Sequence, residues 1–279
     1  MFYVTKDKNM GRKEEIEKQK KERLGLEKYN KQGCLMKIIE YHNYENVVVE
    51  FQDKYKAHVK TSWKYFNNSG LTNPYYPTIC GVGIVGNKYP IFKNNKHTKE
   101  YQAWHNMINR CFYEKIKEEH PTYKNVTCSE EWLLFENFYE WLHLQENFDK
   151  WYNEDKWCLD KDILVKGNKI YSPNTCCLVP QNVNTLFTKK NANRGKLPIG
   201  VFYYAKLKRY QAIIIYGKNN NRSKRTSEYY PTPEDAFYLG YKPAKEAYIK
   251  RVAKEEYAVG NITEKCYNAM MNYEVEITD

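Results

Sequence analysis

The chain has 279 residues, a formal net charge of +11 and 42% hydrophobic residues. This length allows two or three modest domains with folded cores. It contains no apolar run long enough to cross a bilayer, and its charged N-terminus is unlike a secretory signal, so we expect a cytoplasmic protein with no membrane partner. A positive charge of this size favours a polyanion as partner.

The first third of the chain predicts a charged segment followed by a small sheet. Residues 1–32 are rich in both signs of charge and have almost no apolar face, which predicts a solvated helix or arm. Residues 33–78 contain short apolar runs at 36–41, 47–51 and 56–61, separated by Asn- and Gly-containing turns. Short strands at this spacing predict a small antiparallel, barrel-like domain.

The next segment, residues 97–150, predicts helices. Trp104, Met107 and Cys111 recur at helical spacing, and so do Trp132, Phe135, Phe138 and Leu142. We expect these side chains to form a core rather than a platform for stacking bases. They lead into a module over 97–187 that contains the chain's most informative stretch.

That stretch is residues 159–184, LDKDILVKGNKIYSPNTCCLVPQNVN. A short apolar strand ends in Asp160 and Asp162, a turn follows at 166–169, and residues 169–171 predict a second strand. Asn174 lies in the next loop, and a helix is expected near Pro180. Carboxylate and amide oxygens held by such a hairpin and helix suit a hard metal ion, as a metal-dependent phosphodiesterase requires.

This stretch resembles the ββα-metal module of the HNH nuclease family, in a phage-type branch. The resemblance extends upstream to Trp104, Met107, Arg110 and Cys111 and covers roughly residues 100–185. It implies Asp160 and Asn174 as metal ligands and Asp160, Asp162 and Asn174 as the catalytic set, with Mg²⁺ bound if the nuclease is active. It also implies a phage or mobile-element protein in an infected bacterial host.

The sequence departs from this family at Lys161, which occupies the place of the general-base His. A lysine near its ordinary pKa is protonated at neutral pH and cannot accept a proton from water. No histidine follows His143. The resemblance therefore predicts the fold of the module more strongly than its cleavage activity.

Residues 198–279 predict a third part. Strands are expected at 200–204, 210–216 and near 226–229, followed by a helix that Thr232 caps and Pro233 begins, and by a closing helix over 261–272. Three strands followed by a helix resemble the Apetala/ERF-like DNA-binding domain, which lays its sheet in the major groove. The fold class expected for the whole chain is therefore α+β: a small antiparallel β-barrel-like unit, a helical and ββα-metal-like module, and a three-stranded sheet with a helix.

A run without acidic residues joins the last two parts. Residues 188–225 contain eleven Lys and Arg and no Asp or Glu. Such a block binds phosphates with a steep salt dependence, and its arginines suit guanine edges. The nucleic-acid-binding residues predicted here are Lys189, Lys190, Arg194, Lys206, Lys208, Arg209, Arg222, Lys224 and Arg225.

The eight cysteines are expected to be reduced, and their spacings match no zinc pattern, so we do not expect a structural Zn²⁺. Three functions remain open from the sequence. The first is a double-stranded DNA-binding protein on a degenerate HNH-like scaffold. The second is an active Mg²⁺-dependent nicking endonuclease. The third is a phage counter-defence protein that blocks a host antiviral complex.

Overall fold

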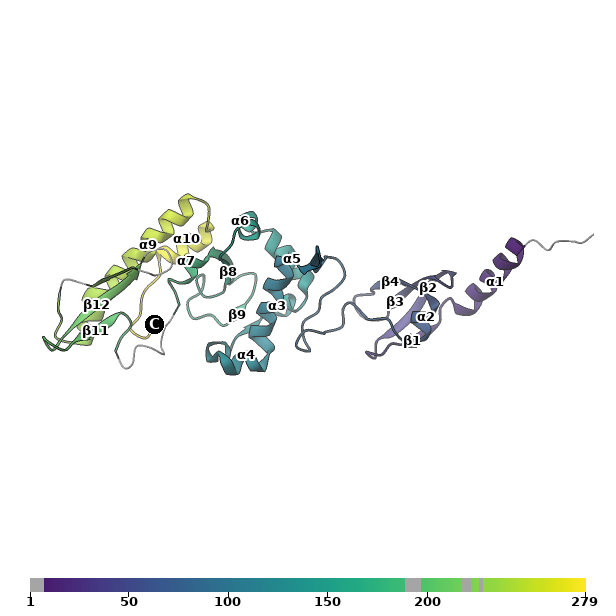
Figure 1. Ribbon diagram of the computed structural model, residues 1–279, viewed down its shortest axis with the longest axis horizontal. Helices are drawn as coiled ribbons and strands as arrows, with labels where there is room; N and C mark the ends of the chain where they lie inside the picture. Colours follow the sequence, from purple (N-terminus) through teal and green to yellow (C-terminus); the bar gives the residue numbers. More distant parts are fainter. Residues whose placement is uncertain (1–7, 189–196, 217–221, 226–227) are drawn as a thin grey trace, which may run out of the picture. The chain divides into compact units, whose positions relative to one another are not determined.

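In a computed structural model, which describes residues 8–188, 197–216, 222–225 and 228–279, the chain is a mixed α+β protein with several small sheets (Figure 1). It divides into two units. Unit 1 contains residues 1–90 and 133–136, and unit 2 contains residues 91–132 and 137–279. Among the described residues, no helix is long and apolar enough to cross a membrane.

Unit 1 is built on an antiparallel sheet in the order β1-β2-β3-β4, and its described strands do not close into a barrel. The strands are β1 (Glu27–Tyr29), β2 (Leu35–Asn43), β3 (Asn46–Phe51) and β4 (His58–Thr61). Alternate side chains such as Met36, Ile38 and Val49 are fully buried, as the period of a half-buried strand requires. The predicted strands are thus confirmed, while β1 lies inside the segment expected to be a separate arm.

Helix α1 (Lys8–Arg23) is charged, as expected, but its last turn is bound to this sheet. The Arg23 guanidinium donates to the Tyr41 hydroxyl over 2.6 Å and stacks 4.2 Å from the centre of the Trp63 ring. The helix ends at Arg23 and is followed by Gly25, whose φ of +83° favours glycine and whose N–H donates to the Ile38 carbonyl. Helix α2 (Trp63–Asn67) follows the sheet.

The helical part of unit 2 agrees with the predicted periodicity. Trp104, Met107 and Cys111 on α3 are at most 1% exposed, and the Trp104 indole donates to the Trp132 carbonyl over 2.8 Å. The elements in this part are β5 (Phe92–Lys93), β6 (Lys96–His97), α3 (Lys99–Phe112), α4 (Glu114–Glu119), a 3₁₀ turn (Pro121–Tyr123), β7 (Thr127–Cys128), a second 3₁₀ turn (Glu130–Leu133), α5 (Phe135–His143) and α6 (Phe148–Asn153).

The central stretch pairs differently from the predicted hairpin. Strand β8 (Trp157–Asp160) pairs antiparallel with β10 (Cys177–Pro180), whereas β9 (Ile170–Tyr171) pairs parallel with β7. The predicted β8–β9 hairpin is therefore wrong. Its physical reason is that the apolar run at 176–179 forms a buried strand and is the better partner for β8. Helix α7 (Gln181–Asn184) begins next to Pro180, as expected.

The C-terminal part has a three-stranded antiparallel sheet followed by helices, which confirms its predicted layout. The sheet contains β11 (Val201–Tyr204), β12 (Arg209–Tyr216) and β13 (Arg222–Arg225). The sequence predicts the third strand near residues 226–229, whereas the structure has it at Arg222–Arg225, four residues earlier. Residues 226–227 lie outside the described residues. Tyr230 instead makes an isolated bridge to Tyr210.

The helices that follow begin as the capping pattern predicts. The Thr232 hydroxyl accepts from the Asp235 N–H over 3.0 Å. The helical elements are α8 (Pro233–Asp235), a π-helical segment (Ala236–Tyr241), α9 (Lys242–Ala258) and α10 (Glu264–Met271). Strands β11 and β12 lie beside α9 and the π-helical segment (Figure 1).

One core joins the segment from β8 to α7 (residues 157–184, the ββα-like stretch) to this C-terminal part. Val179 of β10 and Val183 of α7 pack in the same cluster as Phe237, Ala253 and Met270. The loop between α9 and α10 is also attached to β10, because the Asn147 amide donates to the carbonyls of both Leu178 and Asn261 over 2.9 and 3.1 Å. The two parts therefore share their buried surface within unit 2.

The start of β11 depends on a close approach that glycine permits. Gly200 has φ +70°, and a Cβ there would lie 2.0 Å from the Tyr241 ring, whereas Gly167 has φ +76° and no atom within 4 Å of its ideal Cβ. Both alanine variants carry backbone strain of about 1 kcal/mol, and Gly200→Ala adds an overpacking cost of about 1–3 kcal/mol. We predict from urea unfolding that Gly200→Ala is the less stable. Equal stability of the two variants would contradict this packing.

Candidate functional site

Asp160 ends strand β8 and shapes the loop that follows. Its side chain is buried, and its Oδ1 accepts from the backbone N–H groups of Asp162 over 2.7 Å and Ile163 over 2.8 Å. Burial raises the pKa of Asp160, while these two hydrogen bonds act in the opposite direction. One oxygen of the expected metal ligand is therefore committed to the protein backbone.

Lys161 is buried and faces acceptors. Its Nζ lies 2.7 Å from each carboxylate oxygen of Asp162 and 3.2 Å from the Asn168 carbonyl oxygen. The Tyr171 ring lies 5.7 Å from the same nitrogen. These are the contacts of an ammonium donor. Asp162 is thus held in an ion pair by Lys161.

Asn174 is exposed in the turn between β9 and β10. The Cys176 N–H donates to the Ser172 carbonyl over 3.0 Å, and the hydroxyls of Ser172 and Thr175 are 2.8 Å apart. The Asn174 carbonyl accepts from Lys265 Nζ of α10 over 2.8 Å. The described contacts bring Asp160 and Asp162 into one loop and do not join Asn174 to them.

The loop that runs from Asp160 to β9 (residues 160–169) is the aspartate loop. Two residues that the sequence did not single out support it. The Asn168 amide donates to the carbonyls of Lys161 and Ile170 over 2.9 and 2.7 Å. Tyr171 is buried, and its hydroxyl lies 3.4 Å from Nη1 of Arg110 on α3. The turn sequence around Asn168 could have indicated its role. The contact between Arg110 and Tyr171 could not be predicted from local sequence, because the two residues are 61 positions apart.

The described residues contain no group of three or more His, Cys, Asp or Glu side chains that could hold a metal ion. Four of the five cysteines in and around the module are buried, namely Cys111, Cys128, Cys176 and Cys177. Burial raises the pKa of Cys176 to about 12, so that thiol stays protonated at neutral pH. These thiols behave as small core residues.

The predicted basic residues fall into three groups. Lys189, Lys190 and Arg194 lie outside the described residues. Arg222, Lys224 and Arg225 belong to β13, whose backbone pairs with Tyr216, Ile214 and Ile213 in that order. Lys206, Lys208 and Arg209 lie at the turn between β11 and β12 and are exposed.

This basic turn has a defined geometry. The Leu207 N–H donates to the Tyr204 carbonyl over 3.2 Å and the Lys208 N–H to the Ala205 carbonyl over 3.3 Å. Lys208 has φ +51°, which a non-glycine residue adopts at a cost and which closes the four-residue loop between the strands. Within the described part of the chain, none of the three basic side chains forms an ion pair.

The sheet behind the turn has two different faces. Val201, Ala212 and Ile214 pack into the core, so the alternate residues face away from the helices. Of these, Phe202 is 42% exposed and Ile215 is 45% exposed. The Tyr204 ring lies 5.5 Å from that of Tyr229. The outer face thus offers aromatic and aliphatic surface beside three exposed cations.

Comparison with protein-family models, with curated proteins and with solved structures finds no match to this chain. Its function is therefore inferred from its own geometry.

Substitution of Asp160 distinguishes a backbone cap from a metal ligand. We predict that Asp160→Asn keeps an acceptor for both N–H groups and folds, whereas Asp160→Ala loses about 1–3 kcal/mol of stability because these buried donors are left unpaired. Since the pKa of Asp160 is raised by folding, the stability that its protonated form provides is present at low pH and is lost as pH rises through the folded-state pKa.

The Tm of Asp160→Asn minus the Tm of the wild type should therefore increase from about pH 4 toward neutrality. Thermal unfolding over this pH range measures it. A Tm of Asp160→Asn as low as that of Asp160→Ala would show that the amide does not replace the cap.

Proposed function

We propose that the protein binds double-stranded DNA through the β11–β13 sheet, with its basic turn on the phosphate backbone. The observation that carries this proposal is the turn itself. Lys206, Lys208 and Arg209 are exposed at one end of the sheet, and no described acid neutralises them. Cations in this state gain free energy by displacing counterions from a duplex.

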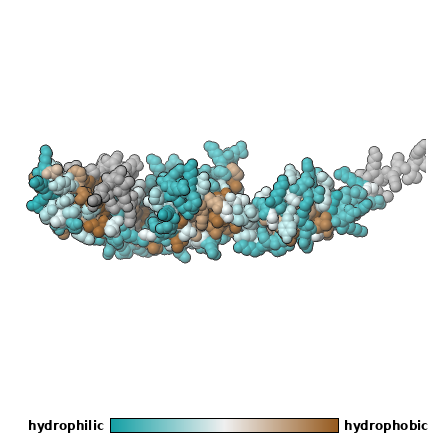
Figure 2. All heavy atoms as spheres, turned by 90° about the horizontal axis from the view of Figure 1, so that it is seen from below, coloured by the Kyte–Doolittle hydropathy of each residue, from teal (hydrophilic) through white to brown (hydrophobic). Residues whose placement is uncertain are grey.

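The outer face of the sheet supports the same proposal. Phe202 and Ile215 are exposed there, and hydrophobic residues reach the surface in the part of the molecule that carries the C-terminal sheet (left in Figure 2). Antiparallel strands fit the major groove, and apolar side chains pack on thymine methyl groups there. The expected Apetala/ERF-like mode of binding uses a sheet face in the same way.

We propose that the ββα-like stretch serves as a scaffold for this sheet and does not hydrolyse DNA. Asp160 Oδ1 is engaged by two backbone N–H groups, and Asp162 is paired with Lys161. A nuclease of this class needs free carboxylate oxygens on the metal and a base for the attacking water. The described contacts of these residues favour support of the loop over catalysis.

Removal of the turn cations tests the binding surface. We predict that the triple variant Lys206→Gln, Lys208→Gln, Arg209→Gln lowers the slope of log K against log salt by about 2–3, because about 0.9 is lost per phosphate contact. Fluorescence anisotropy of a labelled duplex in a KCl series measures this slope.

The matched control is the variant Lys115→Gln, Lys250→Gln, Lys254→Gln, which removes the same charge from exposed positions on helices of unit 2. We expect it to change the slope by less than about 1. If the salt slope decreases equally in the two triple variants, only net charge determines binding. That result would count against the sheet as the binding surface.

A plasmid assay tests the scaffold role. We predict that supercoiled plasmid incubated with the protein and Mg²⁺ or Mn²⁺ shows no more nicked form than plasmid with metal alone, because Asp160 Oδ1 is bonded to two backbone N–H groups and Asp162 is paired with Lys161. Asp160→Asn should behave like the wild type. Metal-dependent nicking that Asp160→Asn abolishes would instead establish the endonuclease.

A further inference from the structure

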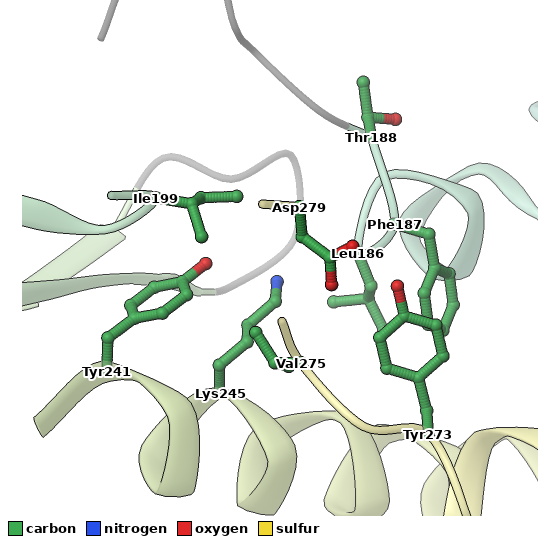
Figure 3. A pocket seen from close by; sticks show the side chains of 9 residues that line it. All are labelled: Leu186, Phe187, Thr188, Ile199, Tyr241, Lys245, Tyr273, Val275 and Asp279. Atoms are coloured by element: carbon green, nitrogen blue, oxygen red, sulfur yellow. The ribbon is translucent and has the colours of Figure 1, made fainter. Parts of the chain in front are cut away.

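A pocket in unit 2 is lined by residues that belong neither to the aspartate loop nor to the basic turn. It is a small pocket that is partly open to solvent. Tyr241, at the end of the π-helical segment, and Lys245 of α9 form its floor (Figure 3). Ile199 lies before β11, Leu186 follows α7, and Tyr273 and Asp279 come from the segment after α10. Its walls are mainly apolar, so a charge inside it is poorly hydrated.

Lys245 points into this pocket from α9 (Figure 3). Among the residues that the structure describes, its ammonium group has no hydrogen-bond or ion-pair partner, and its Nζ lies 5.9 Å from the centre of the Tyr248 ring. Burial lowers the pKa of Lys245 to about 8, and no neighbouring carboxylate opposes this shift. A cation in a site of this kind gains free energy when an anion joins it.

Asp279, which also lines the pocket, is committed to other groups. Its Oδ2 accepts from Lys166 Nζ and from the Glu276 N–H, each over 3.0 Å. Burial raises the pKa of Tyr273, and so does the hydrogen bond between its hydroxyl and Asp279. Lys166 is shared by two carboxylates, because its Nζ also lies 3.3 Å from Glu276 Oε1. Among the described residues, no contact joins the Asp279 carboxylate to Lys245, whose charge therefore has no direct partner.

We propose that this pocket binds one phosphate group, with the Lys245 ammonium as its counter-charge. The opening to solvent admits an anion, and the apolar walls strengthen its attraction to the ammonium group. The phosphate is either free in solution or part of a nucleic-acid backbone, and both have the same oxyanion chemistry. The site does not depend on the sheet's binding DNA, because inorganic phosphate alone is sufficient to test it.

The experiment is calorimetric titration of the full chain with inorganic phosphate at fixed ionic strength, with chloride as the reference anion. We expect saturable binding to the wild type. Lys245→Met keeps the length of the side chain without its charge and should weaken phosphate binding at least tenfold. Lys254→Met removes an exposed cation from the same helix and should change the affinity less than twofold.

Lys245→Met should also fold, since no described ion pair is lost, and Lys245→Gln is a second variant in case it does not. Absence of saturable binding to the wild type overturns the proposal whatever the variants do. The proposal is also overturned if Lys245→Met or Lys245→Gln binds phosphate as tightly as the wild type does.

Measurement of duplex binding then shows whether the phosphate in the pocket is free or belongs to a nucleic-acid backbone. If a backbone phosphate occupies the pocket, Lys245→Met lowers the salt slope for duplex by about 1, and inorganic phosphate competes with the duplex. If free phosphate is the ligand, the wild type and Lys245→Met bind duplex alike while still differing in phosphate binding. Failure of the sheet to bind DNA would leave the phosphate titration unaffected, so the two proposals can fail separately.

Discussion

The shared apolar core of unit 2 is the constraint on which the other features depend. Val179 and Val183 pack with Phe237 and Met270, so the ββα-like stretch and the C-terminal sheet and helices cannot separate without exposing buried hydrophobic surface. Ile163, whose N–H is capped by Asp160, belongs to the same core. The aspartate loop is therefore anchored to the framework that holds the proposed DNA-binding sheet.

This arrangement gives Asp160 and Lys161 a structural role. A carboxylate that caps a turn and a lysine that pairs with the next acid fix a loop of known length between β8 and β9. The loop is attached to α3 through Arg110 and Tyr171, and the turn before β10 is attached to α10 through Lys265. Polar contacts thus reinforce both ends of the segment that the core already holds.

Local patterns predicted much of this fold, and non-local contacts account for what they missed. The spacing of Trp104, Met107 and Cys111 predicted α3, and Thr232 predicted the helix start that follows the sheet. Strand β10 was missed because a four-residue apolar run is ambiguous, and its pairing with β8 is a contact across 17 residues at Asp160 and Cys177. For the site, the sequence identified Asp160 and Asp162 but not their use, because a carboxylate that binds backbone N–H groups and one that binds a metal have the same local sequence.

The central claim is that duplex DNA binds to the outer face and the basic turn of the C-terminal sheet. Amide hydrogen exchange of the full chain, with and without a duplex at low salt, tests it most directly. The account predicts slower exchange at residues 204–209 and along β12, with α9 unchanged. Protection confined to unit 1 or to α3, with none in the sheet, would contradict it.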